Sequence, residues 1–465
     1  MKKQFLILAL TASAVQVMAG GVITNTNQSA PYVRTVSRNA SMDNDAVYFN
    51  PAATAQLSDG IHLSYGHQVC FQTRTTTDDF PTLNRHEYEG KIVVPAFPTL
   101  DAIWKKNHLA ISLGFGPNGG GGNAQYDNGL ASFERQISLI PGMVTKMGSS
   151  MGLSASKYSV DINFKGGSIL YGGQVGAAYS FLDDMLAASV GVRYIYQKNS
   201  YKGSIKNIQI NPTAAALGMD GSMIPATTFF HQVSAALASS NPTMSATAAA
   251  YEASVADKEV DVVQTGMGFT PIIGLSFKPN DKFNFGFKYE MKTKIELTND
   301  TKKDDTGMFP DKATSRKDIP AIMAAGAGFN ITDKFRGSLS YTMYFDKDAN
   351  WNGREKYMDK NTMDVAGNLE YDVIDLLTLS AGYSRSISGA TPEFETDMDY
   401  ALSSNAYGMG GRLNFSEKLN VDFGFMYVAY DKVEKTSTDV NSGIEHTESF
   451  DRVNKCFTLG LNYNF

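Results

Sequence analysis

The chain has 465 residues, a formal net charge of −6 at pH 7 and a mean hydropathy of −0.22, with 43% hydrophobic and 11% aromatic residues. This mild acidity argues against nucleic acid as a partner. Beyond the first residues, no apolar run reaches the ~20 residues that a membrane-spanning helix needs, which leaves a large secreted β protein or a transmembrane β-barrel.

Residues 1–19, MKKQFLILALTASAVQVMA, have the pattern of a secretory signal peptide. Lys2 and Lys3 supply the positive start, an apolar centre follows, and Ala19 ends a small-residue cleavage site. An N-terminal membrane anchor is the alternative, but polar residues interrupt the apolar run. We therefore expect the mature chain to begin at Gly20 and to work outside the cytoplasm.

Residues 20–58 are polar, rich in Asn, Ser and Thr, and lack strand-like alternation. Within them, Asn50-Pro51 predicts a rigid turn or the start of a short helix, because proline fixes φ and asparagine bonds local backbone. A disordered tail is the alternative. The apolar residues Val47, Tyr48 and Phe49 argue against it, since they need something to pack inside.

From residue 59 to 465 the chain alternates apolar and polar residues in segment after segment. In "DKFNFGFKYEMKTKIEL", one face carries Phe283, Phe285 and Phe287, and the other carries Lys288 and Glu290. A period of two indicates β-strands. The segments often reach ten residues and have aromatic residues near their ends, as a tilted membrane-crossing strand would. We therefore predict an all-β fold, a closed antiparallel transmembrane β-barrel, because hydrocarbon tolerates no open sheet edge.

We count about fourteen strands, an even number as bacterial barrels have. The least certain is the second, because Pro95 and Pro98 each lack a ladder donor. Short turns follow the even-numbered strands, which places both termini at the periplasmic end of an outer-membrane protein. Long extracellular loops are then expected at about 117–167 and 200–261. The predicted strands are 60–73, 88–103, 107–116, 168–182, 185–199, 262–278, 281–297, 318–331, 334–347, 361–374, 376–388, 403–415, 418–431 and 451–465.

The two long loops have helical segments with apolar stripes. We expect helices in "ATTFFHQVSAALASS" and "TMSATAAAYEASVADKE", with Asn241-Pro242 as cap and first turn of the second. The apolar stripes are candidates for capturing a hydrophobic ligand, and flexible methionines suit varied ligands. The alternative is that they pack the core of the loops themselves. The candidates are Leu130, Phe133, Ile137, Met143, Met147, Met151, Phe229, Phe230, Val233 and Leu237.

The chain resembles the long-chain fatty acid transporter (FadL/TodX) family of outer-membrane proteins. The resemblance rests on "GGVITNTNQSAPYVRTVSRNASMDNDAVYFNPAA", "IPAIMAAGAGFNITDKFRGSLSY" and "NAYGMGGRLNFSEKLNVDFGFMY". Asn50, Pro51 and Ala52 match the family's Asn-Pro-Ala motif. The resemblance implies a hatch at 20–58 that plugs a fourteen-stranded barrel, and passive uptake of fatty acids, other lipids or aromatic compounds. It also implies a monomer surrounded by outer-membrane lipid and lipopolysaccharide.

Family members are thought to release their cargo sideways, through the wall, at an inward kink in the third strand. The matching segment is "LAISLGFGPNGGGGNAQY". Alternation is normal as far as Phe115 and then fails at Gly116-Pro117 and at Gly119 to Gly122, where proline removes a ladder bond and glycine frees φ. The predicted kink residues are Gly114, Gly116, Pro117, Gly119 and Gly120. We expect strand pairing to break there. The alternative is an ordinary glycine-rich extracellular loop.

Strand parity points several cations into the lumen, where a carboxylate head group would meet them. The alternative is that they pair with lumen acids such as Glu290 and Glu370. One departure from the family bears on the ligand: where many relatives have Asp-x-Asp-Arg, this chain ends the segment with Tyr400. That loss puts a free fatty acid in doubt and favours neutral or aromatic compounds. The candidate cations are Arg193, Lys288, Lys292, Arg336 and Arg412.

The two cysteines lie in the first and last predicted strands, which closure makes neighbours. Cys70 and Cys456 both have lumen parity, so a disulfide across the seam is one expectation and two free thiols are the other.

No motif for catalysis, metal or cofactor stands out: the six histidines are scattered and no G-x-S-x-G elbow occurs. We therefore expect a transporter without catalytic residues, metal or cofactor. A receptor for haem or another hydrophobic ligand is the runner-up. An outer-membrane lipase-like enzyme and a purely structural barrel are further alternatives.

Overall fold

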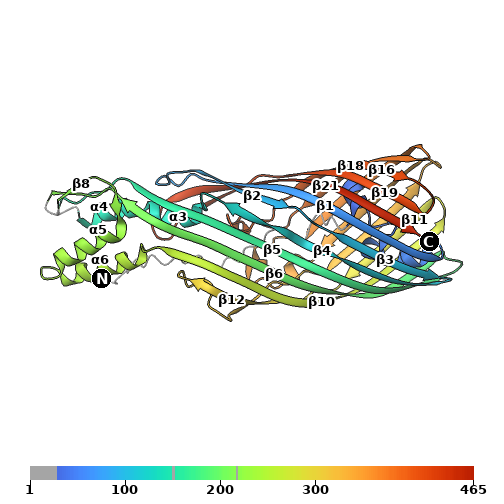
Figure 1. The fold of residues 1–465 in the computed structure, drawn as a ribbon, viewed down its shortest axis with the longest axis horizontal. Helices are drawn as coiled ribbons and strands as arrows, with labels where there is room; N and C mark the ends of the chain where they lie inside the picture. The colour runs from blue at the N-terminus through green and yellow to red at the C-terminus, as the bar shows by residue number, and fades with distance from the viewer. Residues whose placement is uncertain (1–28, 149–151, 216–217) are drawn as a thin grey trace.

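The computed structural model describes residues 29–148, 152–215 and 218–465 (Figure 1). The expected signal peptide and the first residues of the expected hatch lie outside these ranges. None of the described helices is long and apolar enough to cross a membrane.

The chain forms a closed antiparallel barrel of fourteen strands, so the predicted fold class is confirmed. Each strand pairs with the next along the chain, and β21 returns to pair with β1. Four strands are made of two segments. In order, the strands are β1 (Gly60–Asp78), β2 (Glu87–Val94) with β3 (Thr99–Lys106), β4 (Leu109–Tyr126), β5 (Tyr158–Phe181), β6 (Leu186–Ile210), β10 (Lys258–Asn280), β11 (Phe283–Glu290) with β12 (Glu296–Asp304), β13 (Thr314–Arg316) with β14 (Ile322–Asn330), β15 (Phe335–Tyr344), β16 (Thr362–Ile374), β17 (Leu377–Ile387), β18 (Ser404–Asn414), β19 (Leu419–Tyr430) with β20 (Val433–Thr438) and β21 (Glu445–Asn464).

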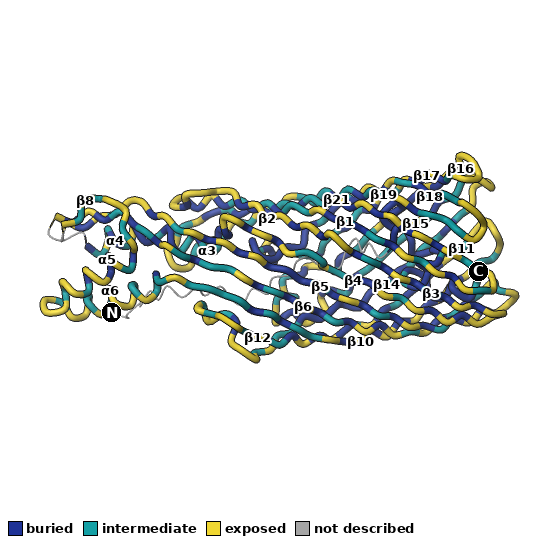
Figure 2. Tube along the Cα trace, in the orientation of Figure 1, coloured by how far each residue is buried: buried dark blue, intermediate teal, exposed yellow. Residues whose placement is uncertain are grey.

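Alternation along each strand separates an outer face from the lumen. In β21, Phe457 and Leu459 are 51% and 60% exposed, while Cys456 and Thr458, which alternate with them, are buried. The same alternation of exposed and buried residues runs along the barrel wall in Figure 2. A large apolar surface exposed on one face of a closed sheet is what a lipid environment requires.

The long loops are shorter than the sequence predicted, because the strands that flank them continue further. β4 runs to Tyr126 and β5 starts at Tyr158, so the first loop is 127–157 rather than 117–167. β6 runs to Ile210 and β10 starts at Lys258, so the second is 211–257 rather than 200–261. Backbone pairing continues where the strict apolar alternation has ended, and alternation was the signal used to place the boundaries.

The loops carry the helices at one end of the barrel, the helical end (Figure 1). The first loop has α3 (Ala131–Ser138) and α4 (Ile140–Gly148), and the second has α5 (Ala226–Leu237) and α6 (Pro242–Ser254). As expected, Asn241 caps α6: its side chain accepts a hydrogen bond from the Met244 backbone N–H at 3.1 Å. Short two-residue strands accompany them: β7 (Thr213–Ala214), β8 (Met219–Asp220) and β9 (Ile224–Pro225). Short 3-10 turns, η4 (Asp346–Asp348), η5 (Arg354–Tyr357) and η6 (Pro392–Phe394), lie in two other loops.

Residues 29–57, the inner segment, lie inside the barrel. They form α1 (Ala30–Thr35), α2 (Ala46–Phe49) and the 3-10 helix η1 (Pro51–Gln56). α1 contacts β16–β19 and β21, whereas η1 contacts β4–β6 and β10 across the lumen. Nearly every residue of the segment is buried although many are polar, so these polar groups need hydrogen-bond partners within the segment or in the barrel wall.

Candidate functional site

Buried ion pairs hold the inner segment to the wall. Arg34 of α1 is bonded to Glu370 of β16 at 2.5 Å and to Asp422 of β19 at 2.9 Å. Arg412 of β18 bonds Asp422 at 2.9 Å and reaches back to Asp43 of the inner segment at 3.2 Å. Charges of the inner segment are thus neutralised by charges of the barrel wall, which fixes the position of the segment.

The Asn-Pro-Ala motif forms the turn between α2 and η1. Asn50 is fully buried, and its side-chain amide donates to the Ser41 carbonyl at 3.2 Å, so it ties the turn to the preceding loop. Pro51 is the first residue of η1, where its missing N–H costs nothing. Its ring packs so close to the wall at Gly274 that a Cβ there would lie 3.3 Å from Pro51 Cγ.

Tyr48 of the inner segment sits between two of the predicted lumen cations. The Arg193 guanidinium is 4.5 Å from its ring centroid and Lys288 Nζ is 4.4 Å from it. Both cations also pair with Glu290 of β11, at 2.7 and 2.6 Å. These two residues are therefore engaged with the segment and the wall.

The other predicted head-group cations also have protein partners. Arg336 pairs with Asp372 at 2.8 Å, and Lys292 Nζ donates to the Asp348 carbonyl at 2.8 Å. With Arg412 paired as above, all five are occupied in this conformation. The ion-pair alternative describes four of the five residues, and Lys292 is held by a backbone carbonyl instead.

The glycine-rich segment of the third strand bends without leaving the sheet. β4 continues to pair with β5 up to Tyr126, so an extracellular loop does not begin at Gly116 and pairing on this side does not break as expected. Instead, two register shifts make Asn118 and Gly121 extra residues. Gly120 has φ +70°, and a Cβ there would overlap the Ser168 carbonyl oxygen, so only glycine fits.

On its other side, β4 does lose its neighbour. It pairs with β3 as far as Phe115, and then with β2 only at Gln125. The second strand is itself interrupted between Val94 and Thr99, where Pro95 and Pro98 stand. Proline cannot donate to a ladder, which accounts for the interruption. The interruption of strand two and the bulges of strand three face each other.

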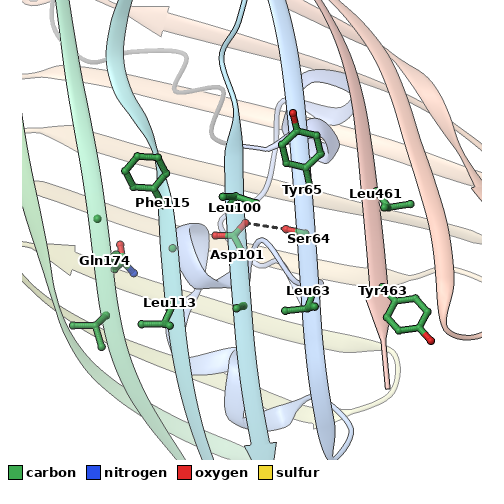
Figure 3. A pocket seen from close by; sticks show the side chains of 14 residues that line it. Leu63, Ser64, Tyr65, Leu100, Asp101, Leu113, Phe115, Gln174, Leu461 and Tyr463 are labelled. Carbon is green, nitrogen blue, oxygen red and sulfur yellow. Dashed lines mark hydrogen bonds between the residues drawn. The ribbon is translucent and has the colours of Figure 1, made fainter.

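Beside these interruptions the outer wall has an apolar hollow of about 760 Å³ (Figure 3). Exposed apolar side chains of β21, β1, β3, β4 and β5 surround it, and Asp101, Gly114 and Gln174 lie at its floor. The same three residues line a small cavity of about 20 Å³ on the lumen side, next to Val47 and Tyr48. A Cβ on Gly114 would lie 3.0 Å from Val47 Cγ1. One thin layer of wall therefore separates the hollow from the inner segment.

The predicted capture residues mostly form the core of the helical end. Leu130, Ile137, Phe229, Phe230 and Val233 are buried. Met143, Met147 and Leu237 are partly buried against the same helices, and Met151 lies outside the described residues. Phe133 differs, because it lines an apolar cavity of about 40 Å³ together with Phe164, Met308, Phe309 and Met398.

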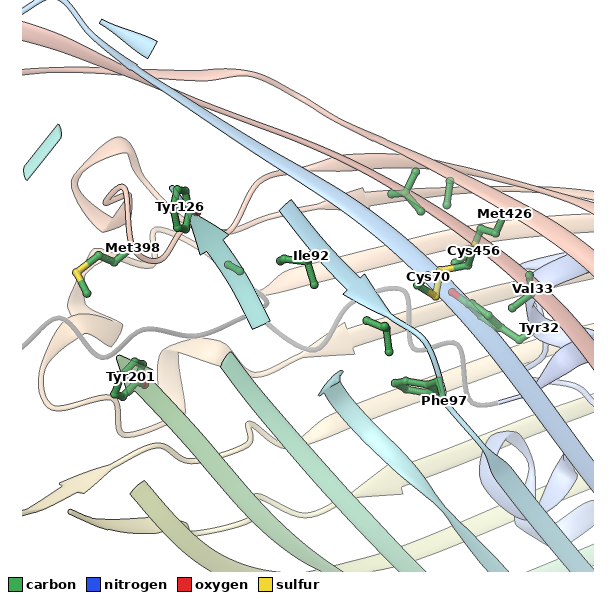
Figure 4. Close-up of a cluster of buried hydrophobic side chains, with 14 of the residues drawn as sticks. Tyr32, Val33, Cys70, Ile92, Phe97, Tyr126, Tyr201, Met398, Met426 and Cys456 are labelled. Carbon is green, nitrogen blue, oxygen red and sulfur yellow. A yellow bond between two sulfur atoms is a disulfide. The ribbon is translucent and has the colours of Figure 1, made fainter. Parts of the chain in front are cut away.

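A buried apolar cluster, the apolar column, extends from this cavity to the inner segment (Figure 4). It includes Phe309 and Met398 near the helical end, Phe97 at the interruption of strand two, and Tyr32 and Val33 of α1. Sequence alternation could not reveal it, because its members come from loops, strand breaks and the inner segment.

The cysteines and Tyr400 flank the column at the barrel seam. Cys70 and Cys456 are direct partners in the β1–β21 ladder and form a disulfide. Tyr400 is fully buried and donates from its hydroxyl to the Asp451 carbonyl at 2.9 Å. Its ring also lies against two arginines, Arg74 and Arg452, which sequence reasoning did not single out.

Solved structures with this fold come from several bacteria. A Pseudomonas aeruginosa FadL homologue has 16% sequence identity and a TM-score of 0.64, with 96% of this chain and 100% of that chain covered. The P. putida toluene transporter TodX has 14% identity and a TM-score of 0.53, covering 91% and 94%. The Ralstonia pickettii toluene transporter TbuX has 14% identity and a TM-score of 0.55, covering 96% and 100%. At these identities the likeness shows the fold alone.

No curated protein matches the chain. The family model of the outer membrane protein transport proteins (OMPP1/FadL/TodX), however, matches residues 10–465, almost the whole sequence. The chain therefore belongs to the OMPP1/FadL/TodX family of outer-membrane transporters of hydrophobic compounds.

Proposed function

We propose that hydrophobic compounds enter this barrel at the helical end, descend the apolar column and leave sideways between strand two and β4, chemically unchanged. The observation that carries this route is the thin wall at Gly114, which has an apolar hollow outside and the inner segment directly inside. In a membrane, such a hollow would be filled by lipid, so a compound that reaches it has already left water.

In this proposal the inner segment acts as the hatch. Val47 and Tyr48 cover the lumen side of the thin wall, and Gln174 of β5 holds the segment by donating to the Val47 carbonyl at 2.6 Å. A compound in the column contacts Tyr32 and Val33 of the same segment. If the compound binds more tightly when the segment is displaced than when it is seated, binding shifts the population towards the displaced state, which exposes the wall.

The orientation follows from the same route. The helical end faces outside, where lipopolysaccharide surrounds it, and the start of β1 and the C-terminal Phe465 face the periplasm. Supporting this, short turns lie at the end where the Ile61 N–H donates to the Phe465 carbonyl at 2.6 Å. The closed sheet satisfies its own edges, so we propose that the protein works as a monomer.

The route is tested by straightening β4. Deleting Asn118 and Gly121 together removes both extra residues and restores an unshifted β4–β5 ladder. We expect equilibrium binding of a labelled hydrophobic compound to persist, because the column is unchanged, while its transfer into cells falls at least tenfold. Gly142→Ala is the matched control, since a Cβ at this position of the helical end has nothing within 4 Å.

Three outcomes distinguish the alternatives. Unchanged transfer by the straightened variant would refute the sideways exit. A compound recovered in hydrolysed form would indicate the lipase-like enzyme. Binding that haem displaces and that long-chain or aromatic compounds do not displace would indicate the receptor.

A further inference from the structure

An acidic residue lies in the barrel wall at the point where the wall is thinnest. Asp101 of β3 is the direct ladder partner of Ser64 in β1 and of Gly114 in β4. The pairing of β3 with β4 ends one pair further on, at Leu100 and Phe115, and the gap beside β4 begins there. Asp101 therefore stands at the edge of the proposed sideways exit.

The missing side chain of Gly114 leaves this acid uncovered. A Cβ on Gly114 would lie 3.2 Å from Asp101 Oδ1, so the carboxyl group borders the place that a side chain of β4 would otherwise fill. Asp101 is 8% exposed, and it lines both the outer hollow and the small cavity on the lumen side. A compound that crosses the thin wall must therefore pass the Asp101 carboxyl group.

The protein provides no close cation for Asp101. Among the residues that the structure describes, its side chain has one hydrogen bond, which the Ser64 hydroxyl donates to Oδ2 at 3.1 Å, and no lysine, arginine or histidine nitrogen within 4.0 Å (Figure 3). Arg193 lines the same small cavity, but Glu290 and Gln174 accept hydrogen bonds from its guanidinium at 2.7 and 3.0 Å. The nearby positive charge is thus directed away from Asp101.

Three other buried acids of the wall have a different environment. Glu290, Glu370 and Asp422 also lie on strands beside the inner segment, and each has two cationic groups within 4.0 Å. Burial of a carboxylate without a cation is costly, so packing alone does not account for Asp101. Ionisable residues within the membrane typically mark the path of a transported molecule.

The position of Asp101 leads to selection by charge. An anion that crosses beside it adds a second negative charge without a counter-ion, whereas a neutral compound adds none. At an effective dielectric constant of ~20, the repulsion between two unit charges ~8 Å apart corresponds to more than ~tenfold. We propose that Asp101 is the charge filter of the sideways exit: uncharged hydrophobic compounds pass it, and a carboxylic acid passes only in its protonated form. This deepens the proposed transport function and rests on it.

The test compares two compounds that have the same chain length and differ in charge. Cells with the full protein in the outer membrane are given radiolabelled decanol or decanoate at pH 8, and the initial uptake is corrected for cells without the protein. Binding of both compounds to the protein in lipid nanodiscs gives the occupancy at each concentration. At equal occupancy, we expect the parent protein to transfer decanol at least tenfold faster than decanoate. This ratio does not depend on any variant.

The ratio of the two rates also separates a filter from a merely structural role. Asp101→Asn keeps the shape and an oxygen that can accept from Ser64, but it carries no charge. It should raise decanoate transfer at least tenfold and leave decanol transfer and both binding constants within about twofold. A structural defect would change both rates together. Asp333→Asn, which removes a negative charge from an exposed turn between β14 and β15, is the matched control and should keep the parent ratio.

The outcomes separate the filter from the route. Decanoate transfer as fast as decanol transfer in the parent protein, or a decanoate rate that Asp101→Asn leaves unchanged, would overturn the filter and leave the route intact. Binding constants that change enough to account for the rates would place Asp101 in the binding step and would also overturn the filter. Saturable binding of decanol without transfer above that of cells lacking the protein would refute the sideways exit itself.

Discussion

The ion pairs of Arg34 predict how firmly the inner segment is seated. Replacing Arg34 by methionine keeps much of the side-chain volume but leaves Glu370 and Asp422 buried without it. Breaking a buried pair on one side costs about 3–5 kcal/mol. Asp422 keeps Arg412 at 2.9 Å, whereas Glu370 keeps only a distant contact with Arg336 at 3.9 Å. We therefore expect a loss near the lower limit, about 3 kcal/mol.

That loss should fall on the segment and spare the barrel, because the strand ladders are untouched. A cost of about 3 kcal/mol raises the open population of the segment roughly hundredfold. Hydrogen exchange followed by mass spectrometry should show residues 29–57 exchanging about a hundred times faster, with the strands unchanged. Arg85→Met, at an exposed site, is the control. Unaltered protection of the segment in Arg34→Met would refute the idea that these pairs hold it.

Three further predictions concern the disulfide at the seam, the loop that carries Glu395, and Gly382, against which α1 packs. Breaking the Cys70–Cys456 disulfide, which spans 386 residues, should lower barrel stability by up to about 5 kcal/mol, seen as a lower unfolding temperature of Cys70→Ser on unheated gels. Burial raises the pKa of Glu395 from 4.5 to about 7, so its loop is most stable below pH 4.5 and loses up to about 3 kcal/mol as pH rises to 7. Glu395→Gln should abolish that dependence of hydrogen exchange in the loop, and a persisting dependence would contradict it. A Cβ at Gly382 would overlap the Thr35 carbonyl oxygen, so Gly382→Val should unseat α1 and expose it to protease in the intact barrel.

The barrel was predictable because its signal repeats. Period-two alternation in segments such as 451–465 fixes strand and face at once, and closure follows from the intolerance of hydrocarbon for free edges. It was less reliable in 281–297, which was predicted as one strand, because pairing stops between Glu290 and Glu296. Beyond that break Ile295 and Leu297, which the alternation places on the same face as Phe283, are buried while Phe283 is exposed. Alternation could not predict how far strand pairing continues beyond the stretches in which apolar and polar residues alternate. Residues 158–167 pair with β6 as part of β5, with one register shift between Ser159 and Asp161, although their composition is typical of a loop. Such pairing is possible because the hydrogen bonds of a ladder are made by the backbone and need no apolar side chains.

The chemistry of the lumen was less predictable, because parity gives the direction of a side chain but not its partner. Arg193 and Lys288 do point inward, yet both meet Tyr48 and Glu290. Tyr48 belongs to a segment whose path through the lumen no local pattern encodes. The apolar column was unpredictable for the same reason, since it is formed by elements that are distant in the sequence.

The juxtaposition of Arg74 and Arg452, by contrast, was within reach of the sequence. If the two cysteines are taken as partners across the seam, antiparallel register fixes every other pair of β1 and β21. Arg74 lies four residues after Cys70, and Arg452 lies four residues before Cys456, so the register places them opposite each other on the lumen face. Two like charges opposed inside a wall are a conflict that folding alone does not favour. The Tyr400 ring, which stacks on both guanidinium groups, eases this conflict, and its place between them could not be predicted from strand register.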